Sequence, residues 1–198
     1  MFVLTADQRA STKAGERVEE LLAALPDLPG LVRRAERTVG DEVQAVLDDP
    51  GDTLRLTLLL QRLGNWATGI GVGDIDNLAA TSRASSGPAF IHAREAVERA
   101  KSRSVPVPIA VSAANAEGAR EVESLLHLIA AVVRRRSDTG WEVVDRLAQD
   151  GRTQTSVAHE LAISQQAVSQ RLAAGLWVEE NGVHPLAIRL LSELEKTP

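Results

Sequence analysis

Hydrophobic patterning divides the first 136 residues into nine predicted elements. Short apolar runs bounded by turn residues predict strands, whereas apolar residues three or four positions apart predict helices. The strands are expected at 1–7, 31–39, 42–49, 65–75 and 105–113, and the helices at 12–25, 52–64, 87–102 and 116–136. Two strand–helix–strand crossovers around a hairpin predict an α+β sandwich of the ferredoxin-like kind.

Glycine and proline positions refine two of these strands. Gly69, Gly71 and Gly73 share one face of the fourth strand, where we expect them to let a helix pack closely. A phosphate-binding loop is the weaker alternative, because the spacing of a dinucleotide fingerprint is missing. Pro106 and Pro108 indicate that the last strand lies at the edge of its sheet.

Near the C-terminus the stretch TQTSVAHELAISQQAVSQRL has the spacing of a helix-turn-helix. Ala158 and Leu161 face inward on one short helix, Val168 and Leu172 do so on the next, and Ser164 is a good N-cap between them. The outward-facing residues of the second helix are then Gln165, Gln166, Ser169, Gln170 and Arg171. Amides and guanidinium groups bind base edges and phosphates, so we predict DNA contacts for these five residues and Ser164. An αα-hairpin with a solvated polar face is the alternative.

The flanks of this unit predict two further helices and a wing. Residues 137–151 carry an amphipathic helix, and Asn181-Gly182 is a dipeptide typical of a two-residue hairpin turn. Pro185 suits the first turn of a last, leucine-rich helix. We therefore divide the chain into three parts: an α+β domain at 1–114, a connecting helix at 115–136 and an all-α helix-turn-helix domain at 137–198, of either the winged or the sigma-region-like kind.

Charge changes the expected mode of DNA binding. The chain has a net charge of −5, and residues 137–198 contain five basic and nine acidic residues. Because phosphate contacts supply most non-specific affinity, a single copy is expected to bind DNA weakly. Two copies reading two half-sites bind more tightly, so we expect a homodimer. The apolar stripe of the connecting helix can pair with its twin in that dimer, or can dock on the sheet instead.

Composition narrows the cellular setting. The chain has no cysteine, which removes disulfides and thiolate–metal sites. Its N-terminus lacks the basic and apolar regions of a signal peptide. Its apolar runs are far shorter than the roughly 18 residues of a membrane span. We expect a cytoplasmic protein with no membrane partner.

Several motifs, taken in order, resemble a known family. GDEVQAVL, GIGVGDI, SGPAFIHAREAVERAK and the terminal helix-turn-helix together resemble the SatD-like family of bacterial proteins, which is similar to the nucleotidyl-cyclase and GGDEF fold. The stretch VGDEV, from Val39 to Val43, stands where a GGDEF signature would fall, but lacks the first glycine and the phenylalanine. The stretch AFIHAR resembles the ALYxAK element, with Arg94 at the lysine.

The resemblance implies a metal and nucleotide site in the α+β domain at 1–114, which we call the front domain. Asp7 and Asp41 match the two carboxylates that hold divalent metals in cyclase-like folds, and such oxygens suit Mg²⁺ bound with a nucleotide. The residues placed to contact a nucleotide are Thr5, Arg9, Gly40, His92 and Arg94. The structural alternative is that Gly40-Asp41 is turn chemistry and Asp7 merely ends a strand.

Three functions follow from these observations. The first is a dimeric DNA-binding transcriptional regulator whose front domain senses or dimerises, with a nucleotide as a candidate ligand. The second is a metal-dependent nucleotide-binding or nucleotide-processing enzyme that uses Asp7 and Asp41. The third is a binding module whose helix-turn-helix contacts protein. We expect regulation rather than catalysis.

Overall fold

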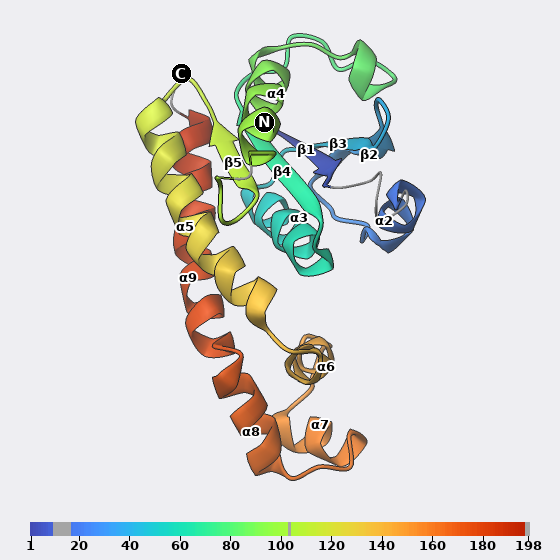
Figure 1. The fold of residues 1–198 in the computed structure, drawn as a ribbon, viewed down its shortest axis with the longest axis vertical. Helices are drawn as coiled ribbons and strands as arrows, with labels where there is room; N and C mark the ends of the chain where they lie inside the picture. Colours follow the sequence, from blue (N-terminus) through green and yellow to red (C-terminus); the bar gives the residue numbers. More distant parts are fainter. Residues whose placement is uncertain (10–16, 103, 197–198) are drawn as a thin grey trace.

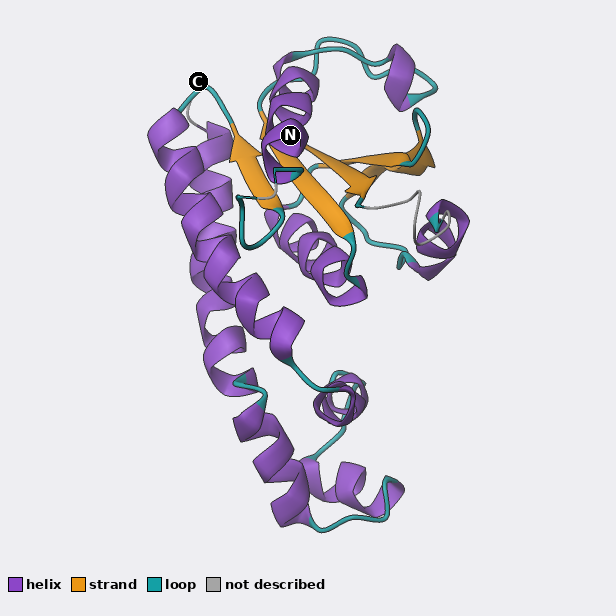
Figure 2. Ribbon diagram, in the orientation of Figure 1, coloured by secondary structure: helices purple, strands orange, loops and turns teal. Residues whose placement is uncertain are grey.

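A computed structural model describes residues 1–9, 17–102 and 104–196. These residues form a mixed α/β structure with five strands, eight α-helices and one short 3₁₀-helix (Figures 1 and 2). Three of the α-helices and the 3₁₀-helix precede the last strand, and the other five α-helices follow it. Within the described ranges, no helix combines the length and the apolar composition needed to cross a membrane.

The five strands form one sheet in the order β2-β3-β1-β4-β5. Their bounds are β1 Phe2–Gln8, β2 Leu31–Arg37, β3 Glu42–Leu47, β4 Trp66–Val72 and β5 Ile109–Ser112. Neighbours pair antiparallel except β4 and β5, which are parallel. All five predicted strands are confirmed, and β5 lies at an edge, as its preceding prolines predict.

Helices cover the two faces of the sheet unequally. α2 (Val18–Ala24), α3 (Pro50–Leu63) and α5 (Ala116–Arg135) pack on one face around the main core. Among the described α-helices, α4 (Pro88–Ala100) alone packs on the other face, mainly against β4, β5 and β1 (Figure 1). The first part of the predicted helix at 12–25, residues 12–16, lies outside the described residues. The uncovered part of the α4 face, over β3 and β2, leaves room for a site.

The glycines of β4 allow α4 to lie directly on the strand, as predicted. A Cβ atom at Gly71 would lie 2.1 Å from the carbonyl oxygen of Ala89. A Cβ atom at Gly69 would lie 2.3 Å from the backbone nitrogen of Val97. Real Cβ atoms do not approach backbone atoms so closely, and only glycine permits this helix–strand distance.

The C-terminal helices are α6 (Asp138–Leu147), α7 (Gln154–Glu160), α8 (Gln165–Ala174) and α9 (Trp177–Lys196). α9 returns alongside α5 to the front domain, where Ala187, Leu191 and Leu194 join the main core (Figure 1). The apolar stripe of α5 packs on β5, α3 and α9. Of the two alternatives for this stripe, docking within the chain is the one observed.

The predicted wing is wrong. Asn181 and Gly182 lie inside α9, and Pro185 lies within the helix rather than in its first turn. The residues that face inward before and after this segment, among them Glu180 and Ala187, are buried at helical spacing. Burial of one continuous face outweighs the local turn preference of Asn-Gly. The Asn181 amide also donates to the carbonyl oxygen of Trp177 at 2.8 Å, one helical turn back.

This correction makes a stability prediction for Gly182. Glycine inside a helix is less stable than alanine by roughly 0.5–1 kcal/mol, and a Cβ atom there would meet nothing within 4 Å. Gly182→Ala is therefore expected to raise the free energy of unfolding by about that amount. Urea unfolding followed by circular dichroism measures the change. A loss of stability would instead indicate the hairpin turn, which needs glycine at this position.

Candidate functional site

A second, smaller core holds α6, α7 and α8 together. Its buried residues are Val143, Val157, Ala158, Val168 and Leu172. Contacts among the three helices are most numerous between α7 and α8 and between α6 and α8. The predicted inward-facing residues of the helix-turn-helix are thus buried together, and the three helices form one unit, called the reader below.

Local capping sets the start of α8. The Ser164 hydroxyl accepts a hydrogen bond from the backbone N–H of Ala167 at 3.1 Å, as an N-cap residue should. Thr153 and Ser156 form a capping box at the start of α7. Ala162, in the turn between the helices, has φ of 52°, the left-handed conformation that glycine usually occupies. The turn therefore forms with alanine at the position where glycine is usual.

The first two turns of α8 present a polar surface to solvent. The side chains of Gln165, Gln166, Ser169 and Gln170 are exposed. Ser164 is also exposed, but its hydroxyl is engaged by its own helix. Glutamine amides at the N-terminal end of a second helix are suited to donate to and accept from base edges. We call these four exposed residues the α8 polar face.

Arg171 is half-buried and paired, unlike the four residues of the α8 polar face, and its predicted DNA contact stays a prediction. Its guanidinium donates to a carboxylate oxygen of Glu142 on α6 at 3.0 Å. The residue stands between the inward-facing Val168 and Leu172, which turns its side chain toward α6. Its role in the structure is to join α6 to α8.

The other arginines of the reader are also paired. Arg146 and Arg152 both bind Glu160, at 3.0 Å and 2.9 Å. The three arginines between residues 137 and 172 thus all face glutamates of the same unit. Such exposed pairs contribute little stability, but they reduce the positive charge available to phosphates.

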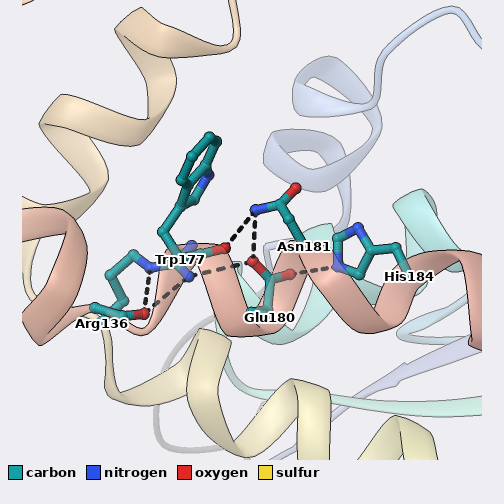
Figure 3. A network of polar contacts seen from close by, with 6 residues as sticks. Arg136, Trp177, Glu180, Asn181 and His184 are labelled. Carbon is teal, nitrogen blue, oxygen red and sulfur yellow. Dashed lines mark hydrogen bonds and ion pairs between the residues drawn. The ribbon is translucent and has the colours of Figure 1, made fainter. Parts of the chain in front are cut away.

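The arginine run at the end of α5 has two different environments. Arg134 and Arg135 are exposed, whereas Arg136 is buried. Arg136 donates to the carbonyl oxygen of Gly175 at 3.0 Å and pairs with Glu180 at 3.3 Å (Figure 3). At most the first two residues of the run can therefore meet DNA phosphates.

Glu180 joins α9 to the C-terminal end of α5. Its carboxylate accepts from Arg136 and Asn181 and lies 2.5 Å from Nε2 of His184 (Figure 3). Burial alone would raise the pKa of Glu180, but the His184 and Arg136 interactions outweigh it and hold the pKa below its ordinary value. We call Arg136, Glu180 and His184 the joint.

Trp141 forms a second connection beside the joint. The guanidinium groups of Arg62 and Arg136 lie over its ring, 4.0 Å and 4.4 Å from the centroid. Arg62, on α3, also makes two hydrogen bonds of 2.6 Å to Asp145 on α6. The front domain thus contacts α6 directly as well as through α5 and α9.

The first of the two predicted metal carboxylates, Asp7, has a partner within the protein. Asp7 lies beside Glu42 across the β1–β3 ladder and pairs with Nζ of Lys101 at 2.8 Å. Burial raises the pKa of Asp7, although Lys101 acts in the opposite direction. Within the described residues no three histidine, aspartate or glutamate side chains gather at metal-binding distance. Asp41 lies close enough to Asp7 for its charge to act on the Asp7 carboxyl. A Mg²⁺ site that these two carboxylates share with a nucleotide stays a prediction, and we derive no metal chemistry from them.

Of the predicted nucleotide contacts, Thr5 and Arg94 line one cleft. Gly40 occupies the nearby β2–β3 turn with φ of 60°. The other two predicted residues, His92 and Arg9, do not line this cleft. Nδ1 of His92 lies 2.8 Å from the carbonyl oxygen of Val72. The backbone N–H of Arg9 donates to Asn65.

This cleft has a volume of about 700 Å³ and lies between the sheet, α4 and the segment of residues 73–87. Most of its lining residues were not predicted, among them the polar Gln44, Ser82 and Arg83. The sequence pattern could have identified Gln44, because it is a polar residue on the same face as Glu42 in an otherwise apolar strand. Residues 73–87 have no regular periodicity, so their position over the sheet could not be predicted.

No protein-family model, curated protein or solved structure matches the chain. Function therefore has to be inferred from the chemistry of the α8 polar face, the joint and the cleft.

Proposed function

We propose that this protein is a DNA-binding transcriptional regulator and that α8 enters the major groove. The observation that carries the proposal is the α8 polar face, displayed at the N-terminal end of the second helix of a capped, independently cored reader. Recognition helices of helix-turn-helix proteins contact bases with this end. Gln165, Gln166 and Gln170 can each bind an adenine through its N6 and N7 atoms.

The ion pairs of the reader support a particular mode of binding. With Arg146, Arg152 and Arg171 held by glutamates, one copy has few free cations for phosphates. Its non-specific affinity should be low and only weakly dependent on salt. We propose that two copies act together, so that selected DNA sites carry two half-sites about 10–10.5 base pairs apart.

The proposal extends to the front domain. The order β2-β3-β1-β4 with antiparallel neighbours, two crossovers and two helices on one face supports a ferredoxin-like, cyclase-related fold. The same sheet followed by a helix-turn-helix supports membership of the SatD-like family. In this arrangement the front domain senses a ligand or dimerises, and α5 and α9 connect it to the reader.

Loss of the glutamine amides tests the base contacts. Selection of bound sequences from random DNA should yield a preferred site for the full chain. Gln166→Ala with Gln170→Ala is expected to weaken binding to that site by about 1–3 kcal/mol per lost base contact, with an unchanged circular dichroism spectrum. Gln149→Ala, an exposed glutamine outside α8, is the control and should keep the sequence preference. A double variant with an unchanged footprint contradicts the proposal.

Release of the paired arginines tests the charge argument. Glu160→Gln removes the carboxylate partner of Arg152 and one of the two carboxylates near Arg146, which keeps Glu142 at 3.9 Å. Non-specific DNA affinity is expected to rise by up to about tenfold per new phosphate contact at 0.1 M salt. Glu193→Gln changes the charge equally at an ion pair near the end of α9 and should have little effect. Fluorescence anisotropy over a salt series measures both, and equal responses of the two variants would contradict local masking.

A further inference from the structure

One wall of the cleft of about 700 Å³ is formed by residues 73–87, and hydrogen bonds hold this wall to β2. Residues 73–87 extend beside α4 toward β2 and carry the 3₁₀-helix Ser82–Ala84 (Figure 1). The Arg33 guanidinium on β2 donates to the carbonyl oxygens of Ala79 and Ala80. Glu36 on β2 accepts the backbone N–H of Ser82. The size is within the roughly 300–1,000 Å³ typical of small-molecule sites.

One buried polar atom in this wall, the Ser82 hydroxyl, has no partner among the described residues. Ser82 is 2% exposed, and its hydroxyl makes no hydrogen bond with any described residue. Leaving a buried hydroxyl unpaired is unfavourable, and most such groups find a partner. Because Ser82 lines the cleft, a bound molecule is a natural partner for it.

The floor of the cleft adds neutral hydrogen-bonding groups and one carboxylate, that of Glu42. Gln44 donates through Nε2 to the Thr5 hydroxyl at 2.9 Å, which fixes the orientation of its amide. Thr38 likewise binds the carboxylate of Glu42. A fixed amide at the base of a cleft can recognise a polar edge of a ligand.

Two arginines at the cleft can bind an anionic group, although the carboxylates of Glu42 and Asp76 also line it. Arg83 donates to the carbonyl oxygen of Thr38 at 3.3 Å and pairs with no carboxylate among the described residues. Arg94 is exposed and has no hydrogen-bond or ion-pair partner in the described part of the chain. Guanidinium groups bind phosphate and carboxylate strongly and with two parallel hydrogen bonds.

Apolar side chains beside the arginines provide a surface for the body of the ligand. Val39 is 65% exposed and Ile91 is 61% exposed, and both line the cleft together with Phe90. Large apolar side chains left open to water beside a cleft indicate a surface that a ligand covers.

We propose that this cleft binds a small organic anion without a metal ion. Its phosphate or carboxylate binds Arg83 and Arg94, its flat or apolar body lies against Val39 and Ile91, and a polar edge meets Gln44 and Ser82. Nucleoside monophosphates and aromatic carboxylates share this chemistry. The proposal does not depend on DNA recognition, because binding is measured on the full chain without DNA.

Isothermal titration and thermal shift in EDTA test the site, with GMP, AMP, salicylate and inorganic phosphate as probes. At least one organic anion should bind with one-to-one stoichiometry and raise the melting temperature. Nucleotide binding alone would assign a nucleoside phosphate, and salicylate binding alone an aromatic carboxylate. Failure of all three organic probes, or phosphate binding as tightly as any of them, would overturn the proposal.

Three variants locate the binding. Arg94→Ala and Arg83→Ala should each weaken the organic anion about tenfold or more, whereas Arg120→Ala, an exposed arginine on α5, should not. Ser82→Ala removes an unpaired buried hydroxyl, so the free protein should be equally or more stable while ligand affinity falls. Unchanged affinity in both Arg83→Ala and Arg94→Ala would place the ligand elsewhere and overturn the assignment.

Discussion

Glu180→Ala is expected to lower the free energy of unfolding by about 3–5 kcal/mol. The substitution leaves the Arg136 guanidinium buried, with its side chain 1% exposed, and removes its carboxylate partner. An uncompensated buried charge is among the most destabilising changes in a folded protein. Because the joint holds α5 against α9, the loss should also loosen the reader from the front domain. Urea unfolding with separate probes for the two parts, Trp66 in the sheet and Trp141 in α6, measures both effects.

A double variant provides the control for this prediction. Arg136→Met with Glu180→Leu removes both charges and keeps similar volumes, and replacing buried ion pairs in this way is often neutral or stabilising. Most of the stability lost in Glu180→Ala should therefore return. A single variant that loses less than about 1 kcal/mol would show that water reaches the pair and that the joint is not a buried connection.

The joint also predicts a dependence on pH. Because the pKa of Glu180 is lower in the folded protein than its ordinary value of 4.5, the ionised carboxylate favours folding. This contribution is complete above the ordinary value and is lost as the pH falls through the lower, folded value. Between about pH 5 and pH 3, the wild type should therefore lose more stability than Glu180→Gln, which has no proton to gain at this position.

Gly71→Ala is expected to be destabilising by about 3 kcal/mol or more, at the upper end of the range for overpacking. The added methyl group would lie 2.1 Å from the carbonyl oxygen of Ala89 and 2.2 Å from the backbone nitrogen of Ala93. These atoms belong to the α4 backbone, so a side-chain rotation cannot relieve the clash. α4 has to move away from β4, and Arg94 moves with it. Thermal unfolding measures the loss, and ligand titration should show weaker binding in the cleft.

Gly182→Ala is the matched control for this substitution. It adds the same methyl group where nothing lies within 4 Å, and is expected to stabilise the chain. Opposite signs for the two glycine variants would confirm that the close approach at β4, rather than a general effect of glycine replacement, causes the loss. Equal, small effects would contradict the helix–strand distance.

Local patterns in the sequence were sufficient for the order of strands and helices up to α5 and for the helix-turn-helix. Each of those signals is carried by neighbouring residues: the Ser164 cap, the inward Val168 and Leu172, and the small residues of β4. Such interactions act over one or two turns and survive in any tertiary context that buries the same face.

Long-range contacts determine the features that local sequence patterns did not predict. Asn181-Gly182 reads as a turn, yet α5 and the main core hold it inside α9, because burial of a continuous apolar face exceeds the turn preference of two residues. Asp7 reads as a metal ligand, but the end of α4 brings Lys101 to it. Arg171 reads as a DNA contact, but α6 supplies Glu142.

The division between these two groups has one physical cause. The sequence by itself determined features whose partners lie within a few residues, where the spacing fixes which groups meet. Only the tertiary structure decided which charge each arginine and aspartate meets, and which surfaces enclose the cleft between β1, β3, α4 and residues 73–87. Those partners lie tens of residues away, and only the packing of the sheet and helices determines their distances.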